Sequence, residues 1–438
     1  AGLPSDVPPP SGPGIILHAP PPAPTVLAEA ASSPSVSVPR LKRHLANVLT
    51  SPGLGKHLAF AVSQLGDPAA RWAYGAPSAT PASTLKLLTT TAALSVLGPD
   101  HRFTTSVMPG STRRSIVLVG GGDPLLVAAA PTAREAAGMY PQPASLEDLA
   151  TATAARLAIE GVRRVRLGYD ASLFSGPAVN PRWPTTYLPE NIVSPISALW
   201  VNEGRETAGY AQRSANPALA AAEAFRTQLA NTGIASAGRI REQDQPPAAG
   251  APLAEVTSAP LEQIVQHILE VSDNEGAEVL LRQVAIAQGR TGSSVAGVTA
   301  VRSALTALGL DLRGALFYDG SGLSRDDVLP LPLLLDALEA DAAPDDPELR
   351  GVITGLPVAG FSGSLGYRFD DKAADGLGYV RAKTGTLTGV HALAGFAMTR
   401  TGQALFFVAI ADQVPVPKTL RARADLDRIA ATLTTCGC

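Results

Sequence analysis

The sequence predicts an α/β (α+β) protein in which one domain is interrupted by a second. Strand-like and helix-like segments stand at both ends of the chain, around a middle that is mainly helical. Residues 101–255 have a different texture, because short apolar strands alternate there with turns and a few helices. We therefore expect one domain from residues 41–100 and 256–438, with an antiparallel sheet flanked by helices, and an inserted domain between its two parts.

The composition suits a large globular protein. The 438 residues are 45% apolar and 17% charged, with a net charge of −3, so two or three domains with sizeable cores are expected. Nothing in this balance predicts nucleic-acid binding. No apolar run approaches the roughly 18 residues of a membrane span, so membrane contact should be peripheral at most. These features favour no particular oligomeric state.

The two ends of the chain differ from the rest in composition. Residues 1–40 hold 11 of the 38 prolines, which predicts an extended polyproline-type segment, either a spacer or a strip along the domain surface. The chain starts with Ala and shows no signal peptide, so we interpret it as a mature or trimmed form. Two cysteines, Cys436 and Cys438, are too few for a disulfide framework or a zinc site. A small-ring disulfide and a free pair both fit this tail.

The first part of the main domain should contain a helix, a hairpin and a second helix. Apolar residues repeat at helical spacing over 41–49. Two apolar runs, 57–62 and 70–74, are joined by a Gly-Asp-Pro turn and predict a hairpin. An almost continuous apolar run over 85–97 is closed by Gly98 and Pro99, as is typical of a buried helix.

The remaining elements follow the same signals. In the insert we expect strands over 115–119 and 164–169 and a helix over 217–231 with Asn216 as N-cap. The glycines at 120–122 lack the spacing of a nucleotide-binding loop and are interpreted as a turn. Beyond the insert, periodicity predicts helices over 261–271, 277–288, 331–338 and 418–433, a strand over 379–386, and a hairpin of 392–399 with 404–410.

The first chemical signal is Ser83-x-x-Lys86 at the start of the helix over 85–97. Residues three apart lie on one face of a helix, so the lysine can reach the serine hydroxyl. A serine near the positive end of a helix with a lysine one turn later suits a nucleophile and its base, with no histidine required.

Two further motifs follow in order. Ser272-Asp273-Asn274 lies between two predicted helices, and Lys383-Thr384-Gly385 lies on a predicted strand. Each motif alone has an ordinary interpretation, as a helix cap or as the exit of a strand. Together with the serine–lysine pair they form the set of motifs found in class A β-lactamases and penicillin-binding proteins.

The three motifs suit acyl transfer. Ser83 would attack a carbonyl carbon and form an acyl-enzyme, and Lys86 would take the proton of its hydroxyl. Burial and the positive charge of Lys383 would both lower the pKa of this base. Ser272 would relay the proton to the leaving amine, and Asn274 would hold the substrate amide.

The third motif is the expected binding strand. Lys383 and Thr384 would bind a substrate carboxylate, and Gly385 would let the substrate backbone lie against the strand. The backbone N–H groups of Ser83 and Thr386 would form the oxyanion hole. This chemistry needs no metal and no cofactor.

The gap between Ser83 and Ser272 is much longer than a β-lactamase-like arrangement requires, and it accommodates the insert. The chain resembles the class C low-molecular-mass penicillin-binding proteins, the D-alanyl-D-alanine carboxypeptidase/endopeptidase family, over about residues 50–435. Further stretches that carry the resemblance are Val-Gly-Gly-Gly-Asp-Pro-Leu at 119–125, Phe-Ser-Gly-Pro at 174–177, Pro-Ile-Ser-Ala-Leu at 195–199, Tyr-Asp-Gly-Ser-Gly-Leu-Ser at 318–324, and Leu-Pro-Val-Ala-Gly at 356–360 with Gly-Ser-Leu at 363–365.

The resemblance implies a penicilloyl-serine-transferase (β-lactamase/transpeptidase-like) fold with an inserted domain. It implies action on peptidoglycan stem peptides outside the cytoplasmic membrane, in the periplasm or cell wall, acylation by β-lactam antibiotics, and no metal or cofactor. The loop around Ser362, Gly363, Ser364 and Leu365 would border the cleft, with Ser362 and Leu365 as its substrate-binding residues. Trp183 and Tyr187, in the insert, would contact the stem-peptide side chain, with packing as their alternative role. The insert is short for this family, and the proline-rich segment falls outside the match.

Two other functions are compatible with the motifs. A serine β-lactamase needs fast deacylation, usually from a dedicated carboxylate; Glu190 lies in the insert, and nothing in the sequence places it in the cleft. A non-catalytic wall-binding or β-lactam-sensing protein is the third possibility, which an intact set of motifs disfavours. His391, just beyond the third motif, is interpreted as a structural strand histidine rather than a residue of the cleft.

Overall fold

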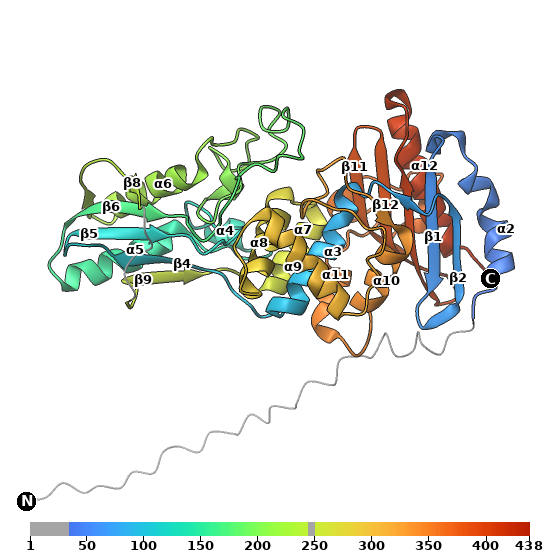
Figure 1. Ribbon diagram of the computed structural model, residues 1–438, viewed down its shortest axis with the longest axis horizontal. Helices are drawn as coiled ribbons and strands as arrows, with labels where there is room; N and C mark the ends of the chain where they lie inside the picture. Colours follow the sequence, from blue (N-terminus) through green and yellow to red (C-terminus); the bar gives the residue numbers. More distant parts are fainter. Residues whose placement is uncertain (1–34, 244–249) are drawn as a thin grey trace, which may run out of the picture.

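The main sheet consists of five antiparallel strands in the order β11-β12-β13-β1-β2. The computed structural model describes residues 35–243 and 250–438, so most of the proline-rich segment lies outside the described residues. Figure 1 shows the sheet at one end of the elongated molecule. Its strands are β1 (Leu58–Gln64), β2 (Asp67–Gly75), β11 (Val380–Leu387), β12 (Val390–Met398) and β13 (Ala404–Ala411).

Strand β13 shows why this sheet forms the centre of the main domain. All eight of its residues are buried, although successive side chains of a strand point to opposite faces. Phe406 and Val408 join the apolar cluster on one face, whereas Phe407 and Ala409 join the cluster on the other. The continuous apolar run in the sequence therefore reflects a sheet that is covered on both sides.

Two groups of helices supply that cover. One cluster unites the sheet with α2 (Val38–Leu49) and α12 (Thr419–Thr434), which stand beside the strands in Figure 1. The opposite cluster contains residues of α3 (Leu85–Leu97), α7 (Leu261–Val271), α8 (Asn274–Ala287), α9 (Ser294–Ala307), α10 (Leu331–Asp341) and α11 (Arg350–Thr354).

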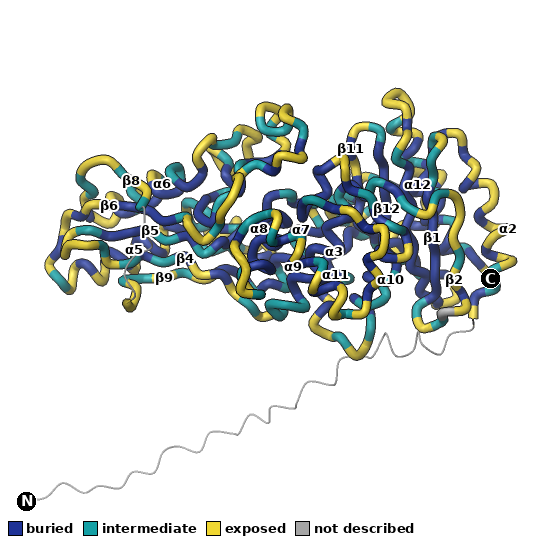
Figure 2. The backbone as a smooth tube through the Cα atoms, in the orientation of Figure 1, coloured by how far each residue is buried: buried dark blue, intermediate teal, exposed yellow. Residues whose placement is uncertain are grey.

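Helix α3 runs through the middle of this helical layer. Every residue from Leu85 to Leu94 is buried, and Figure 2 shows the helix enclosed by buried backbone. Its polar side chains in this stretch are buried too, and the hydroxyl groups of its three threonines donate to carbonyl oxygens inside the protein. The residues at the N-terminal end of α3 are therefore held in place by the core.

A second sheet lies at the other end of the molecule (Figure 1). Strands β4 and β5 pair antiparallel, β5 and β6 pair parallel, and the order is β7-β6-β5-β4-β9, with β8 also paired to β6. Helices α5 (Leu146–Ile159) and α6 (Pro217–Asn231) pack on it in a separate apolar cluster. The strands are β4 (Thr104–Pro109), β5 (Ser115–Val119), β6 (Arg164–Asp170), β7 (Ala235–Ser236), β8 (Arg241–Glu242) and β9 (Ala254–Thr257).

These elements overlap the range 101–255 for which the sequence predicts an inserted domain, and β9 extends two residues beyond it. Short elements complete the chain: α4 (Ala133–Ala136) in this second part, and the two-residue strands β3 (Ser78–Ala79) and β10 (Leu329–Pro330), which pair with each other beside the main domain.

Most predicted helices and strands are present, with shifted ends. Helix α2 begins three residues before the predicted range, inside the proline-rich segment, with Pro39 in its first turn. Helix α8 begins at Asn274 rather than at 277, so the second motif itself starts this helix. The prediction did not single out α5 and α9, although Ser145 and Ser293 cap them through side-chain oxygens.

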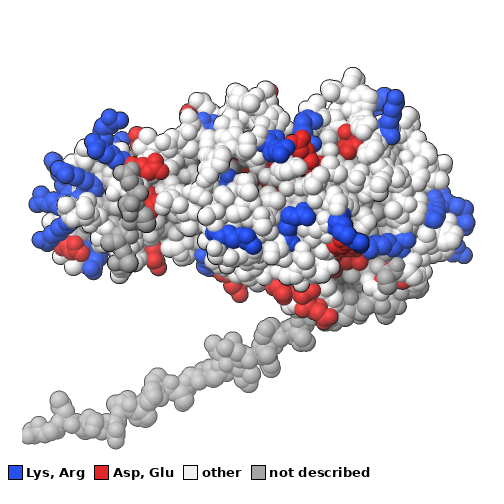
Figure 3. Space-filling view, in the orientation of Figure 1, with Lys and Arg blue, Asp and Glu red and all other residues white. Residues whose placement is uncertain are grey.

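Charged side chains are unevenly distributed. Figure 3 shows Lys and Arg gathered at the end of the molecule that holds β5 and β6, whereas both signs are scattered over the main domain. The exposed arginines there include Arg113, Arg114, Arg164 and Arg166. Among the described residues, no helix has the length and apolar character needed to cross a membrane.

Candidate active site

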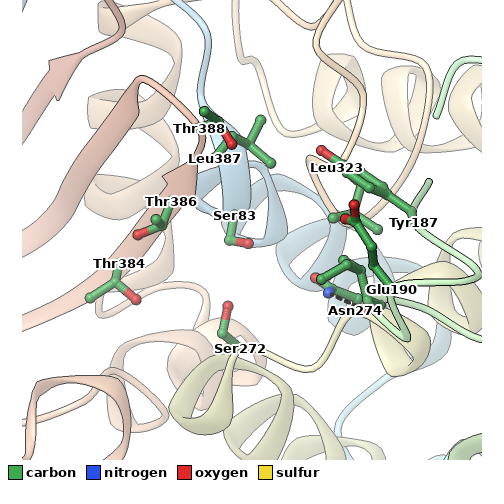
Figure 4. A pocket seen from close by; sticks show the side chains of 11 residues that line it. Ser83, Tyr187, Glu190, Ser272, Asn274, Leu323, Thr384, Thr386, Leu387 and Thr388 are labelled. Carbon is green, nitrogen blue, oxygen red and sulfur yellow. Dashed lines mark hydrogen bonds between the residues drawn. The ribbon is translucent and has the colours of Figure 1, made fainter. Parts of the chain in front are cut away.

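The three motifs meet at a cavity of about 450 Å³ between the main sheet and the helical layer. Ser83, Ser272, Asn274, Thr384 and Thr386 line it, and Figure 4 shows their side chains directed into the same space. The remaining lining residues are Tyr187, Glu190, Ile192, Leu323, Leu387 and Thr388. Segments that are far apart in sequence are thus brought together as the spacing of the motifs requires.

Ser83 lies in a single 3₁₀ turn, Ala82–Thr84, directly before α3. The preceding Ala82 is fully buried and has φ +46, a conformation that costs an alanine free energy and that is often found at functional sites. A Cβ atom on Gly322 would lie 1.9 Å from the Ala82 carbonyl oxygen. The close approach of Gly322 therefore helps to fix the turn that presents the serine hydroxyl.

Lys86 is buried completely and reaches three oxygens. Its Nζ lies 3.0 Å from Oγ of Ser83, 2.8 Å from Oδ1 of Asn274 and 2.8 Å from the carbonyl oxygen of Ser321. Burial lowers the pKa of Lys86 to about 8, although the charges of nearby carboxylates raise it. Lysine, normally protonated, is thereby brought close to the range in which it can act as a base at neutral pH.

Buried carboxylates below Lys86 organise its surroundings. Oε1 of Glu278 accepts hydrogen bonds from the N–H groups of Gly320 and Ser321 and from the Ser321 hydroxyl. Asp319 accepts the N–H group of Gly322. These bonds hold the turn in which the carbonyl oxygen of Ser321 accepts a hydrogen bond from Lys86. The prediction missed this turn as a part of the site; its only signal was the Tyr-Asp-Gly-Ser-Gly stretch.

The second motif presents two polar groups from the junction of α7 and α8. Ser272 ends α7 in the left-handed region, with φ +63, and its Oγ accepts a 2.7 Å hydrogen bond from Nζ of Lys383. Asn274 begins α8, and its Nδ2 donates to the carbonyl oxygen of Ile192 at 3.3 Å. Asn274 therefore connects the base, Lys86, to the loop of the insert.

The third motif lies on β11, but its lysine does not line the cavity. Lys383 is fully buried and donates to Ser272 and to the Thr384 carbonyl oxygen at 2.9 Å. Burial lowers the pKa of Lys383 well below its usual value, and the charge of Lys86 lowers it further. The cavity wall is formed by the hydroxyl groups beside Lys383, so binding of a carboxylate by Lys383 stays a prediction.

The absence of a side chain at Gly385 allows close packing within the protein. A Cβ atom at this position would lie 2.8 Å from the Pro81 carbonyl oxygen and 2.9 Å from Cβ of Ala392. Its absence lets β11 approach the segment that leads into the serine turn. The prediction assigned this close approach to the substrate backbone instead.

The comparisons with known proteins agree with this geometry. Residues 41–212 and 205–433 match the family described as D-Ala-D-Ala carboxypeptidase 3 (S13). The chain belongs to this family.

Two curated mycobacterial relatives cover almost the whole chain. The carboxypeptidase DacB of Mycolicibacterium smegmatis is 35% identical over 96% of this chain and 90% of its own length. A carboxypeptidase of Mycobacterium tuberculosis is 36% identical over 97% of this chain and 91% of its own length. Both alignments extend into residues 1–40, so the prediction that the proline-rich segment lies outside the match is wrong for these relatives, although it holds for the family model.

A solved structure shares the fold of this S13-family chain. Penicillin-binding protein 4 of Haemophilus influenzae superposes with a TM-score of 0.70 and 22% identity, over 90% of this chain and 98% of the other. The predicted penicilloyl-serine-transferase fold with its insert is thereby confirmed.

The loop at 362–365 reaches the third motif through Ser364, and not through Ser362 or Leu365, the two loop residues expected to bind substrate. Ser364 accepts a 2.8 Å hydrogen bond from the Thr384 hydroxyl. Ser362 instead accepts the N–H group of Val358, and Leu365 is buried in the core. Neither Ser362 nor Leu365 lines the cavity, so Ser364 is the member of this loop that supports the site.

The insert contributes Tyr187 and Glu190 to the cavity, but not Trp183. Trp183 is buried, and its Nε1 donates to Oδ2 of Asp319 at 2.7 Å, so the structure shows its alternative role, packing. Glu190 lines the cavity near Asn274 in Figure 4, which corrects the expectation that nothing places it there. The sequence held no signal for this, because the loop is positioned by contacts with segments distant in sequence, among them Asn274 and Asp319.

His391 lies opposite Thr386 on β12 and is buried. Burial lowers the pKa of His391 to about 4, and the charge of Arg423 lowers it further. A neutral imidazole that does not line the cavity agrees with a structural rather than a catalytic histidine.

If Lys86 is the base, acylation of Ser83 should rise with pH until this lysine is neutral. A pKa of about 8 predicts that the acylation rate constant rises ~10-fold per pH unit below that value and levels off above it. Stopped-flow labelling with a fluorescent penicillin between pH 5.5 and 9.5 measures this dependence. A rate that is flat from pH 6 to 8 would contradict the assignment.

Glu278→Gln provides the matched variant for this profile. The amide oxygen can still accept the same N–H groups, but the charge that raises the pKa of Lys86 is lost. The midpoint of the profile should therefore move to lower pH, whereas Glu255→Gln, at an exposed position of β9, should leave it in place.

Proposed function

We propose that this protein is a serine D,D-peptidase that cleaves the D-Ala-D-Ala bond of peptidoglycan stem peptides through an acyl-enzyme on Ser83. The observation that supports this most directly is the hydrogen bond between Ser83 and the buried Lys86, in a chain of the S13 carboxypeptidase family. Acylation by β-lactams and a location outside the cytoplasmic membrane belong to the same proposal.

Acylation requires a neutral Lys86. Its Nζ takes the proton as Oγ of Ser83 attacks the carbonyl carbon of the penultimate D-alanine, and the N–H groups of Ser83 and Thr386 bind the developing oxyanion. The C–N bond then breaks, and the leaving amine must gain a proton. Ser272 is suited to deliver it: as its hydroxyl proton passes to the amine, its oxygen takes a proton from the Lys383 ammonium group through the hydrogen bond already present.

Deacylation uses the same groups in reverse. Water attacks the acyl carbon in place of the released D-alanine, and its proton returns through the groups that protonated the amine. A peptide with a larger leaving amine undergoes the same steps, so endopeptidase cleavage of cross-links needs no further residue.

The terminal carboxylate of the substrate is expected beside β11. The hydroxyl groups of Thr384 and Thr386 line this wall, and the ammonium group of Lys383 lies directly behind it, with hydrogen bonds to Ser272 and the Thr384 carbonyl oxygen. Lys383 is therefore proposed as a positioning residue that supplies positive potential, while the hydroxyl groups donate hydrogen bonds to the carboxylate.

The opposite wall should receive the side chain of the stem peptide. Tyr187 and Glu190 lie there, on the loop of the insert that faces Asn274 (Figure 4). A carboxylate at this place favours a substrate with a positively charged amino group on that side chain.

A serine β-lactamase is the second candidate, and the position of Glu190 in the cavity is the one observation that favours it. Such an enzyme needs a carboxylate to activate the deacylating water, and Glu190 is a carboxylate in the right space. The relatives that cover the chain are carboxypeptidases, so we favour the peptidase.

Release of D-alanine tests the proposed activity. The wild-type protein should release D-alanine repeatedly from a stem-peptide mimic that ends in D-Ala-D-Ala, because the acyl-enzyme hydrolyses. Ser83→Ala should reduce the rate at least ~10³-fold, as expected when a nucleophile is removed, with an unchanged circular dichroism spectrum. A folded wild-type protein that binds penicillin but releases no D-alanine would instead support the non-catalytic alternative.

Glu190→Gln separates substrate binding from deacylation. With a stem peptide that carries a free side-chain ammonium group, kcat/KM should fall ~10-fold, which corresponds to about 1.4 kcal/mol. The same peptide with an acetylated amino group should show no change, and the penicilloyl adduct should decay at the wild-type rate. An adduct that is short-lived in the wild type and persistent in Glu190→Gln would favour the β-lactamase.

A further inference from the structure

A second cluster of potential ligands lies next to the catalytic loop, outside the cavity. It consists of Glu203 from the insert, His267 from α7 and Asp273 from the turn between α7 and α8. One donor atom from each residue lies within 4.8 Å of the other two. Three separate segments of the chain therefore direct one imidazole and two carboxylates to a common point.

The carboxylate of Asp273 has no hydrogen-bond partner among the described residues. The residue is 7% exposed, and neither of its side-chain oxygens forms a hydrogen bond within the described residues. Asp273 is the N-cap residue of α8, yet its side chain makes no capping bond. Burial raises the pKa of Asp273 to about 6, and the nearby N–H group of Gly276 offsets this only in part, without hydrogen-bond geometry.

Such a group is costly to bury, since a desolvated carboxylate needs a proton, a cation or several donors to compensate for lost water. A helix-capping role does not account for the buried carboxylate of Asp273, because its side chain forms no capping hydrogen bond. The buried oxygens of Asp273 thus indicate a ligand that is not part of the protein.

The other two residues have donor atoms available. The ring nitrogens of His267 form no hydrogen bond within residues 35–243 and 250–438, so the imidazole is not committed elsewhere. Oε2 of Glu203 accepts a 2.6 Å hydrogen bond from Arg205, so Oε1 is available for a second partner. A carboxylate with one oxygen bound to an arginine can still ligate a metal through the other.

The charges around the cluster also favour a cation. Glu203, Asp273 and Glu275 form one group of carboxylates, and Arg205 and Arg213 are the guanidinium groups that pair with two of them, at 2.6 Å and 2.8 Å. Asp273 is the carboxylate without a guanidinium partner; the positive charges that act on it are those of His267 and, from the active site, Lys86.

We propose that Glu203, His267 and Asp273 bind a divalent transition-metal ion, for which Zn²⁺ is the closest chemical fit. Imidazole together with carboxylate oxygens is a common zinc ligand set, in which three protein ligands leave a fourth position for water. Ligand atoms at about 2.0–2.2 Å from zinc stand roughly 3.3–3.6 Å apart, so side-chain shifts of about 1 Å would close the site.

The metal site lies outside the cavity of the serine chemistry proposed above, but it shares Asp273, whose charge raises the pKa of Lys86. Its ligands join the insert to the turn that carries Ser272 and Asn274, and the ion would fasten these segments together. It would act as a structural cross-link whose loss loosens the junction between the insert and the turn that carries Ser272.

Calorimetric titration of the untagged, EDTA-dialysed full chain with ZnCl₂ tests the site. We expect one ion per chain at micromolar affinity or better, and a Tm that rises with ZnCl₂, because a ligand that binds only the folded state stabilises it. His267→Gln should weaken binding at least 100-fold and abolish the Tm shift. Co²⁺, added in place of Zn²⁺, should give visible absorption bands in the wild type that His267→Gln loses.

Matched controls distinguish this site from adventitious binding. Glu203→Gln should also weaken binding, whereas His44→Gln on α2 and Glu206→Gln, exposed three residues from Glu203, should bind Zn²⁺ like the wild type. Wild-type protein that binds no Zn²⁺ at millimolar concentration, or equal affinity in the wild type, His267→Gln and Glu203→Gln, would overturn the proposal.

Discussion

The structure depends on the burial of one lysine ammonium group beside a serine hydroxyl. Burial disfavours the charged form of Lys86, and its pKa falls from 10.5 to about 8, a difference of ~3 kcal/mol between the two protonation states. The negative charges of nearby carboxylates limit this fall in the pKa of Lys86. If the lysine stood in water it would be protonated at neutral pH, and if it were buried without acceptors its cost would destabilise the fold.

The fold supplies what this arrangement needs. Helix α3 is buried on all sides over residues 85–94, so the core holds the serine turn and the lysine at a fixed distance. Two glycines allow neighbouring backbone to approach closely. Gly322 packs against Ala82, and Gly385 packs against Pro81. The loop of the insert reaches the same place through Ile192, which accepts a hydrogen bond from Asn274. The insert is therefore connected to the base through one asparagine.

The sequence was sufficient to predict the residues whose chemistry is local. Ser83 and Lys86 are one helical turn apart, and the other two motifs stand at the end of a helix and on a strand, where spacing and periodicity reveal them. Contacts made only by folding were not predictable: the carboxylate of Glu278 below the lysine, the entry of Glu190 into the cavity, and the burial of Trp183. The burial of Lys383 was likewise not predictable, because sequence shows that a lysine is present but not whether its ammonium group lines the cavity or lies behind its wall.

The central claim is that Ser83 is the nucleophile and that the folded chain alone assembles its base. The most direct measurement is mass spectrometry of the intact protein after benzylpenicillin, followed by peptide mapping of the adduct. We expect one penicilloyl group per chain on Ser83, formed by the wild type and lost in both Ser83→Ala and Lys86→Met. An adduct on another residue, or undiminished acylation in Lys86→Met, would contradict the account.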